Sequence, residues 1–388
     1  MSVKKWLLKI NAFVHLWLGL FSGLVVFILG LTGCILTFQT EIEDFMAPYR
    51  KVNTVEEYHQ RPSQVVKPLL DSLGQVTLTS LGYPGADRSI SVGYTDEKGQ
   101  AYTAYLDPKD GAILHIQPNT IGFFMVMLHL HIRLLLPGII GHAIISYATV
   151  IYILLLLSGM VLWWPKKWKK RLLRNGLTIR WKGKAKRVNY DLHNVLGFYT
   201  FLPSILLAVT GIFISLNWFT KGVYWISTAG ASLPERRVPQ SEMPADPAVL
   251  PLQAIDSVWQ ILGIDKHRTT HALQFVFPQK PRDVVTVTDN PHPSTAHLAV
   301  IRHYDRYTFK TIPMPHYWQK DVNQANLGDM IGRYNFDVHV GRIAGMPGKI
   351  LAFFISLVCT SLPVTGFLIW YRRSLRKKKS KSNTSKKT

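Results

Sequence analysis

The chain has 388 residues, 47% of them hydrophobic, and carries a formal net charge of +22. Of its 45 Lys and Arg residues, three lie in 1–11, eleven in 166–187 and nine in 371–388, and none of these segments contains an acidic residue. Each segment borders a long apolar run, so the charge indicates membrane topology and contact with anionic lipid, and argues against a nucleic-acid partner.

Four apolar runs each exceed the length of about 18 residues that a helix needs to cross a bilayer. They lie at 12–38, 139–164, 192–217 and 344–371. The positive-inside rule places both termini and the basic loop 165–191 in the cytoplasm. The segment 1–38 then holds the N-terminus and first span, 372–388 is a basic tail, and 39–138 and 218–343 lie outside.

The first and third spans share one spacing pattern: a histidine, a glycine four residues later, and a Thr-Gly pair beginning seventeen residues after the histidine. The residues are His15, Gly19 and Thr32-Gly33 in the first span, and His193, Gly197 and Thr210-Gly211 in the third. A glycine one turn after a histidine lies on the same helical face, where a flat ring can approach the backbone. Pro203 predicts a kink in the third span.

Thr32-Gly33-Cys34 also resembles a lipoprotein cleavage site, but the apolar run is longer than a signal peptide requires. We interpret Cys34 and Cys359, which both lie inside spans, as small apolar packing residues.

The spans form two similar halves. The second span ends in Ser158-Gly159 and the fourth in Thr365-Gly366, each with a tryptophan four residues after the glycine. The order of span, outer region, outer histidine and span occurs in 1–164 and again in 192–370. This pattern predicts a parallel duplication.

Each outer region is expected to form a small α+β module. The first has a helix at Ser63–Leu73, strands at Ser89–Tyr94, Gln100–Leu106 and Ala112–Ile116, and a turn at Asp107–Gly111. The second has a helix at Leu252–Leu262 and strands at His271–Phe277, Asp283–Thr288, Ala296–Arg302 and Tyr307–Ile312. The second pattern is weaker because Phe309 stands where the first has Gly111. The sequence YLDPKDGAILHI, which ends the first module, resembles the closing hairpin of the PepSY domain.

The predicted topology places His15 and His193 at the cytoplasmic ends of their spans, and His131 and His339 at the outer ends. Neutral imidazole is an axial ligand for haem iron, and facing helices can each supply one ligand. The pattern favours haem at both levels. Proton transfer or helix packing is the alternative, although acidic partners are nearly absent from the spans. For the partner of His339 we favour His131 and leave His129 and His142 open.

The motifs HLWLGL…LTG, LHIRLLLPG, DLHNVLGF and VHVGRIAGMPG resemble the PepSY-associated transmembrane family, which includes the FoxB-type ferric-siderophore reductases. The resemblance implies a mainly α membrane fold, with four transmembrane helices in a duplicated 2+2 arrangement and two periplasmic α+β modules. It also implies the bacterial inner membrane, two b-type haems on the four histidines, and reduction of a ferric siderophore on the periplasmic face.

No nucleotide-binding motif occurs in the chain, so the electrons are expected from quinol or a separate reductase. Arg133 and Arg342 are candidates to pair with haem propionates. The candidates for the wall of the substrate site are Tyr317, Trp318 and Tyr334.

Two other classes of function stay open at this point. One is a haem-free regulator or scaffold of a periplasmic peptidase, and the other is an iron-chelate permease component. The sequence shows no pair of broken helices bearing polar groups, which disfavours transport.

Overall fold

The computed structural model describes residues 3–53, 60–165, 176–244, 249–263 and 270–385, and side chains up to residue 375. Residues 166–175 of the predicted basic loop lie outside these ranges. The chain divides into two compact units, each built from separate stretches of sequence. The helical unit contains residues 1–39, 122–219 and 338–388, and the sheet unit contains 40–121 and 220–337.

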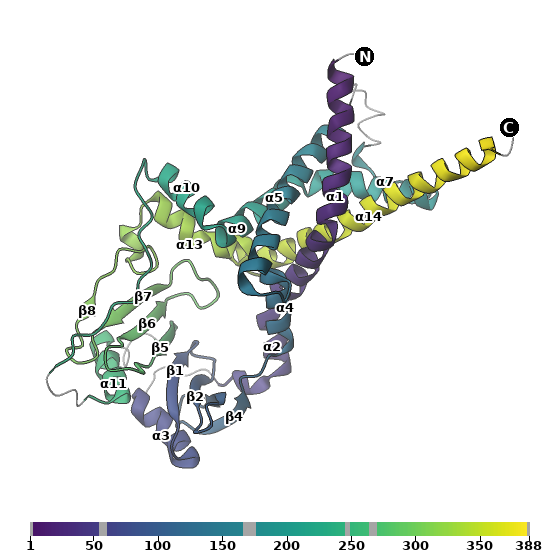
Figure 1. Ribbon diagram of the computed structural model, residues 1–388. Coiled ribbons are helices and arrows are strands. Elements are labelled where there is room, and N and C mark those ends of the chain that lie inside the picture. The colour runs from purple at the N-terminus through teal and green to yellow at the C-terminus, as the bar shows by residue number, and fades with distance from the viewer. Residues whose placement is uncertain (1–2, 54–59, 166–175, 245–248, 264–269, 386–388) are drawn as a thin grey trace. The chain divides into compact units, whose positions relative to one another are not determined.

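The helical unit holds the apolar helices (Figure 1). Its elements are α1 (Val3–Thr37), α4 (Phe123–Arg133), α5 (Gly138–Trp163), α7 (Ala185–Asp191), the π-helical turn η2 (Leu192–Leu196), α8 (Gly197–Tyr199), α9 (Phe201–Ser215), the 3-10 turn η4 (Arg342–Ala344) and α14 (Gly345–Ser385). The chain passes between the units within α2 (Gln39–Met46), α10 (Asn217–Ser227) and α13 (Leu327–His339).

Among the described residues, three helices are long and apolar enough to cross a membrane: Val3–Thr37, Gly138–Trp163 and Arg342–Leu375. A bent pair, Ala185–Tyr199 with Phe201–Ser215, makes a fourth if it counts as one span. Large apolar side chains point outward from these helices, such as Phe21, which is 82% exposed, and Leu202, which is 73% exposed. Such a surface is stable against lipid tails, so the chain is a multi-pass membrane protein.

The bent pair confirms the predicted kink at Pro203. The two helices meet at 65° around Thr200. Proline has no N–H to donate, and its ring clashes with the carbonyl of the residue four positions earlier, here Tyr199. The helix therefore breaks one turn before the proline, where Thr200 has left helical geometry with φ −91° and ψ 0°.

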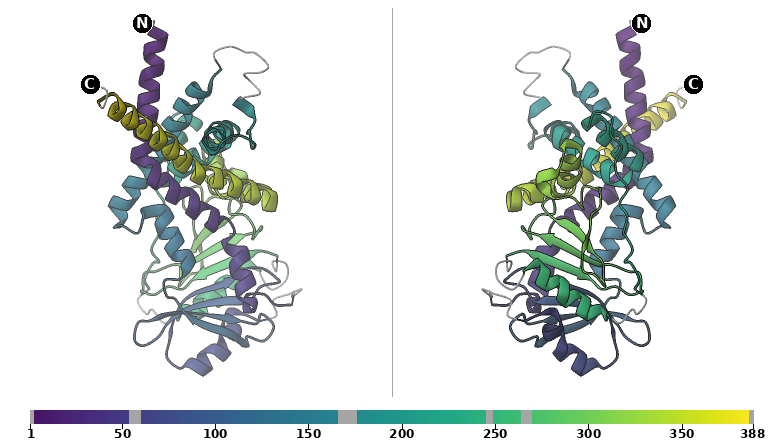
Figure 2. Two further views of the ribbon diagram at one scale, coloured as in Figure 1. Left: turned by 90° about the vertical axis from the view of Figure 1, so that its right-hand side faces the viewer. Right: turned by 90° about the vertical axis from the view of Figure 1, so that its left-hand side faces the viewer.

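The helices α1 and α14 cross in close contact, as two further views show (Figure 2). A Cβ atom added at Gly30 would lie 2.9 Å from the backbone N of Thr360 and 3.0 Å from the carbonyl O of Ser356. Glycine is therefore what lets the two backbones approach. The sequence suggested Gly19 and Gly23 for such a contact, but a Cβ there would meet its neighbours only at 3.7 and 3.4 Å.

The sheet unit contains one eight-stranded sheet with the order β4-β3-β2-β1-β5-β6-β7-β8, antiparallel at every pairing. The strands are β1 (Thr77–Tyr83), β2 (Ile90–Thr95), β3 (Ala101–Leu106), β4 (Ile113–Pro118), β5 (Ala272–Val276), β6 (Val285–Asn290), β7 (Val300–Tyr304) and β8 (Thr311–Ile312). Helix α3 (Pro62–Leu73) precedes the first four strands and α11 (Pro251–Leu262) the last four. Two short 3-10 turns, η1 (Pro48–Arg50) and η3 (Val322–Gln324), complete the described elements.

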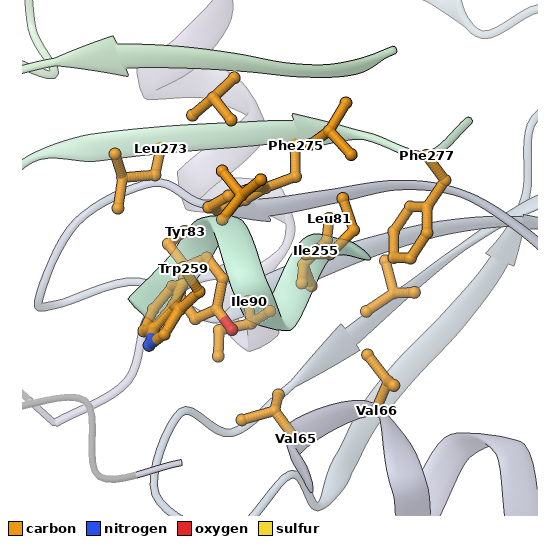
Figure 3. Close-up of a cluster of buried hydrophobic side chains, with 14 of the residues drawn as sticks. Val65, Val66, Leu81, Tyr83, Ile90, Ile255, Trp259, Leu273, Phe275 and Phe277 are labelled. Atoms are coloured by element: carbon orange, nitrogen blue, oxygen red, sulfur yellow. The ribbon is translucent and has the colours of Figure 1, made fainter. Parts of the chain in front are cut away.

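Both helices share one apolar core with the sheet (Figure 3). Trp259 of α11 is fully buried, with its ring centre 4.7 Å from that of Tyr83 on β1. Val66 and Leu69 of α3 are equally buried in the same cluster. Burying these side chains supplies the main stabilisation of the unit, because the free energy gained by removing apolar area from water scales with that area.

The two predicted modules are joined into one sheet, so the expectation of a mainly α fold leaves out an extended β layer. Most of the predicted helices and strands are present, but β1 was missed because its sequence, TLTSLGY, is rich in Thr, Ser and Gly. This strand forms the junction: β1 pairs with β5 of the second copy, with Leu81 opposite Phe275. Pairing removes an open edge from each four-stranded half.

The closing turn is the same in both copies despite their different sequences. The N–H of Gly111 donates to the carbonyl of Asp107 at 2.9 Å, and the N–H of Phe309 donates to the carbonyl of Asp305 at 2.9 Å. Both residues have positive φ, 75° for Gly111 and 57° for Phe309. The second copy therefore keeps the turn and holds a bulky residue in the left-handed region, which costs about 1–2 kcal/mol.

This geometry predicts that replacing two turn glycines by alanine lowers the stability of the protein by different amounts. Gly99 and Gly111 both have positive φ, but a Cβ at Gly99 meets nothing within 4 Å, whereas one at Gly111 collides with the carbonyl of Val65. Gly99→Ala should cost only the backbone strain of about 1–2 kcal/mol. Gly111→Ala should lower the unfolding midpoint of the purified protein clearly further, and equal shifts would refute the collision.

Candidate functional site

Two histidines from the two halves of the sequence face each other at one level of the helical unit. His15 lies on α1 and His193 in η2, and their ring centres are 6.4 Å apart with the planes at 86°. Both side chains are partly exposed to a cavity, which both of them line. We call this the His15–His193 site.

A second pair lies at another level of the same unit. His131 is on α4 and His339 is the last residue of α13, and their ring centres are 6.3 Å apart with the planes at 56°. We call this the His131–His339 site. The structure therefore brings together the two pairs that the sequence suggested, across about 180 and 210 residues of chain.

The cavity at the His15–His193 site has a volume of about 750 Å³ and mostly apolar walls. This volume lies in the range of cofactor and ligand pockets. Gly19 and Gly197 both line it, and a Cβ at either would meet only a leucine methyl at 3.7 Å. Packing of the protein against itself therefore does not require glycine at these positions, and the missing side chains widen the cavity instead.

Every one of the four histidines has its Nδ1 atom against a hydroxyl group. His15 Nδ1 lies 2.8 Å from Ser158 Oγ, and His193 Nδ1 lies 2.9 Å from Thr365 Oγ1. At the other site, the corresponding distances are 3.0 Å from His131 to Thr32 and 3.0 Å from His339 to Thr210. These hydroxyls belong to the Ser-Gly and Thr-Gly pairs noted in the sequence, whose contacts spacing alone did not reveal.

Two asparagines take part that the sequence analysis missed. Asn11 Nδ2 donates to the carbonyl of Ser158 at 3.0 Å, and Asn189 Nδ2 donates to the carbonyl of Thr365 at 3.1 Å. Each asparagine stands four residues before a site histidine, on the same helical face. The shared spacing of Asn, His and Gly at intervals of four was the signal that could have identified them.

The backbone around His193 is unusual. Residues Leu192–Leu196 form a π-helical turn between α7 and α8. Such turns insert one extra residue into a helix and are concentrated at functional sites. No sequence pattern predicted this turn.

The other two histidines proposed as ligands are engaged or directed elsewhere. His129 accepts a hydrogen bond at Nδ1 from Arg133 Nη2 at 3.0 Å, one helical turn along α4. His142, near the start of α5, is exposed. Arg133 Nε is buried without a hydrogen-bond partner among the described residues. Arg342 lies in η4, three residues after His339.

The aromatic residues suggested for a substrate wall pack within the sheet unit. Tyr317 is 9% exposed and lies against α13, where a Cβ on Gly332 would come within 2.8 Å of its ring. The Arg333 guanidinium lies over the Trp318 ring at 5.6 Å. Tyr334 stacks on His297, with ring centres 4.3 Å apart. These contacts give all three side chains a packing role.

Both cysteines are buried free thiols. Cys34 Sγ lies 3.5 Å from the carbonyl of Phe353, and Cys359 Sγ accepts from Tyr152 Oη at 3.0 Å and lies 3.3 Å from Ser204 Oγ. Cys359 is therefore more than an apolar filler, because it joins α5, α9 and α14 through polar contacts.

The donor set fits haem better than a protein-bound metal ion. Within the described residues, no group of three or more His, Cys, Asp or Glu side chains is arranged to hold a metal ion. Two imidazoles that face one ion, with metal–nitrogen bonds of about 2.0 Å and about 1.2 Å from nitrogen to ring centre, have ring centres roughly 6.4 Å apart. The pairs at 6.4 and 6.3 Å meet this spacing.

A comparison with protein families supports the membrane assignment. The family model described as the PepSY-associated TM region matches residues 12–373, which is nearly the whole chain. No curated protein matches this chain.

A buried histidine of the sheet unit predicts a pH effect on stability. The pKa of His316 is lowered to about 4, chiefly by burial and also by Arg236, Lys320 and Arg333, while Asp329 opposes the shift. Below pH 6.5 the unfolded chain binds a proton that the folded chain does not, so stability should fall between pH 6.5 and 4, by at most about 1.4 kcal/mol per pH unit. In thermal unfolding scans, His316→Gln should weaken this dependence, whereas His292→Gln, at an exposed position, should not.

Proposed function

The chain belongs to the PepSY-associated transmembrane family, and we propose that it is a di-haem b protein that carries electrons across the bacterial inner membrane. The His15–His193 and His131–His339 sites would each hold one haem, and each haem supplies one-electron transfer when bound. The proposed substrate is a ferric siderophore on the periplasmic side.

The observation that carries this proposal is the occurrence of two imidazole pairs, both with the ring spacing of a shared metal, in one helical unit. Proton transfer explains the pairs less well. None of α1, α5, α9 and α14 contains an aspartate or glutamate. Two aspartates lie two residues before a site histidine, but Asp191 pairs with Arg187 and Asp337 accepts from the N–H groups of Ala296 and His297. Helix packing alone does not account for a cavity of about 750 Å³ between His15 and His193.

The surrounding residues have roles that follow from their contacts. Gly19 and Gly197 put no side chain into the cavity, and this would favour a flat macrocycle against the backbone. Arg133 holds His129 through Nη2 and keeps a buried Nε–H available. A guanidinium with an unused donor suits a propionate carboxylate, because charge-assisted hydrogen bonds are the stronger ones. Arg342 is the matching candidate beside His339.

The proposed orientation rests on the charge distribution. The basic segments support a topology with the His15–His193 site toward the cytoplasm and the His131–His339 site toward the periplasm. Quinol or a separate reductase would donate the electrons, and Fe(III) in the ferric siderophore would accept them. Hard oxygen ligands of a siderophore hold Fe(II) less tightly than Fe(III), so one-electron reduction releases the metal.

The absorption spectrum of protein purified in detergent after haem-replete expression tests the proposal. We expect a low-spin six-coordinate spectrum and two b-type haems per chain. His15→Ala and His339→Ala should each remove about one haem, because each deletes one of the paired ligands. His142→Ala is the matched control, since its side chain is exposed, and it should retain both.

A colourless wild-type protein would leave the haem-free regulator and the permease component as the remaining candidates. Retention of both haems in both alanine variants would show that other residues are the ligands.

The cavity predicts a second effect. Gly19→Leu and Gly197→Leu each place a side chain into the space beside the His15–His193 pair. Each variant should therefore lose the haem of that site and keep the haem of the His131–His339 site. Gly138→Leu is the control, because a Cβ at Gly138 meets nothing within 4 Å. Haem content by pyridine haemochrome measures the result, and full retention in both leucine variants would contradict the placement of a ring in this cavity.

A further inference from the structure

Four hydroxyl–glycine pairs recur in the helical unit, and crossing a membrane does not require them. They are Thr32-Gly33, Ser158-Gly159, Thr210-Gly211 and Thr365-Gly366. Each contacts one of the four site histidines through both of its residues. Because the same contact occurs at all four site histidines, we infer that it has the same physical role at each of them.

In every pair, the hydroxyl group already donates its proton to a backbone carbonyl of its own helix. Thr32 donates to the carbonyl of Ile28 at 2.7 Å, and Thr365 donates to that of Ser361 at 2.9 Å. Thr210 donates to Leu206 at 2.8 Å and Ser158 to Leu155 at 3.0 Å. A hydroxyl has one proton and two lone pairs, so a group that donates to a carbonyl can meet a further neighbour only as an acceptor.

The histidine must then be the donor. Its Nδ1 lies 2.8–3.0 Å from an oxygen that can only accept, so Nδ1 carries the hydrogen. His339 shows the same requirement a second time, because its Nδ1 also lies 3.1 Å from the carbonyl of Leu207, which has no proton to give. In a neutral imidazole with a hydrogen on Nδ1, the lone pair is on Nε2.

The glycine of each pair lets the Nδ1–Cε1 edge of the ring come close to the helix that holds it. A Cβ would come 3.1 Å from His193 Cε1 at Gly366, 3.2 Å from His15 Cε1 at Gly159, and 3.3 Å from His339 Cε1 at Gly211. At Gly33 the distance to His131 Cε1 is 3.5 Å. A side chain would push the ring away from the hydroxyl in the closest cases, so the two residues of the pair act together.

The contacts follow a simple rule. Each hydroxyl binds a histidine of its own half of the sequence: Ser158 and Thr32 hold those of the first half, and Thr365 and Thr210 those of the second. The ring pairs instead join one histidine from each half. Each half of the sequence therefore orients its own two imidazoles, and both sites are complete only when the two halves pack together.

We infer that the hydroxyls of Ser158, Thr365, Thr32 and Thr210 are positioning residues that fix each site histidine as the Nδ1–H tautomer and present Nε2 for ligation. The inference rests on the proposed function, in which Nε2 binds haem iron. Partners that orient a ligating histidine also raise its basicity, and their loss typically weakens metal binding 10- to 100-fold.

The test uses the full-length protein with Thr365→Val and Thr32→Val, which keep the side-chain shape and remove the acceptor. Haem transfer to apomyoglobin and the two midpoint potentials are measured. For Thr365→Val we expect about tenfold faster loss of one haem and a higher potential for that haem alone, because a less basic ligand stabilises Fe(III) less. Thr32→Val should affect the other haem. Thr365→Ser and Thr32→Ser should restore wild-type values.

The matched control is Thr360→Val on the same helix as Thr365. Thr360 makes the same bond to a carbonyl one turn back, to Ser356 at 2.8 Å, and no described histidine bonds to it. It should leave both potentials unchanged.

The outcomes separate the two proposals. A wild-type protein without haem overturns the proposed function and this inference with it. Two haems in the wild type, with unchanged loss rates and potentials in both valine variants, overturn the inference alone. A change that serine does not rescue, or one that Thr360→Val reproduces, shows a general packing effect and also overturns it. Thr32→Val carries the test by itself if Thr365→Val fails to insert.

Discussion

The hydrogen bond between each imidazole Nδ1 and a serine or threonine hydroxyl is the contact on which the helical unit is organised. An imidazole inside an apolar bundle is costly unless its polar atoms have partners. The hydroxyl satisfies one ring nitrogen and turns the other toward the opposite half of the chain. The glycine beside it keeps the ring close to the backbone, and Asn11 and Asn189 bind the carbonyls of Ser158 and Thr365 behind it.

In both units, two halves of the sequence complete each other, although one unit is helical and the other is built on a sheet. In the helical unit, each half contributes one histidine to each site, and the ring that faces it comes from the other half. In the sheet unit, each half is a four-stranded sheet behind one helix, and the edges β1 and β5 pair to make one layer. A half alone would leave each site histidine without its facing ring and would leave a strand edge open.

Two histidines of the sheet unit have partners of a different chemical type from those of the four site histidines. In the sheet unit, His297 and His271 lie against carboxylates, Asp337 at 2.8 Å and Asp289 at 2.7 Å. The four site histidines of the helical unit, His15, His131, His193 and His339, face hydroxyls and each other instead.

The sequence by itself determined the number and length of the apolar segments, the kink at Pro203, most of the strands, and the positions of His15 and His193. These features depend on local properties: hydropathy over about 20 residues, proline's missing N–H and the 3.6-residue helical repeat. Only the tertiary structure decided that His131 faces His339, that β1 joins two modules into one sheet, and that a hydroxyl orients each imidazole. Those features join residues between 99 and 208 positions apart, and their geometry depends on how helices cross and strands pair, which local spacing does not encode.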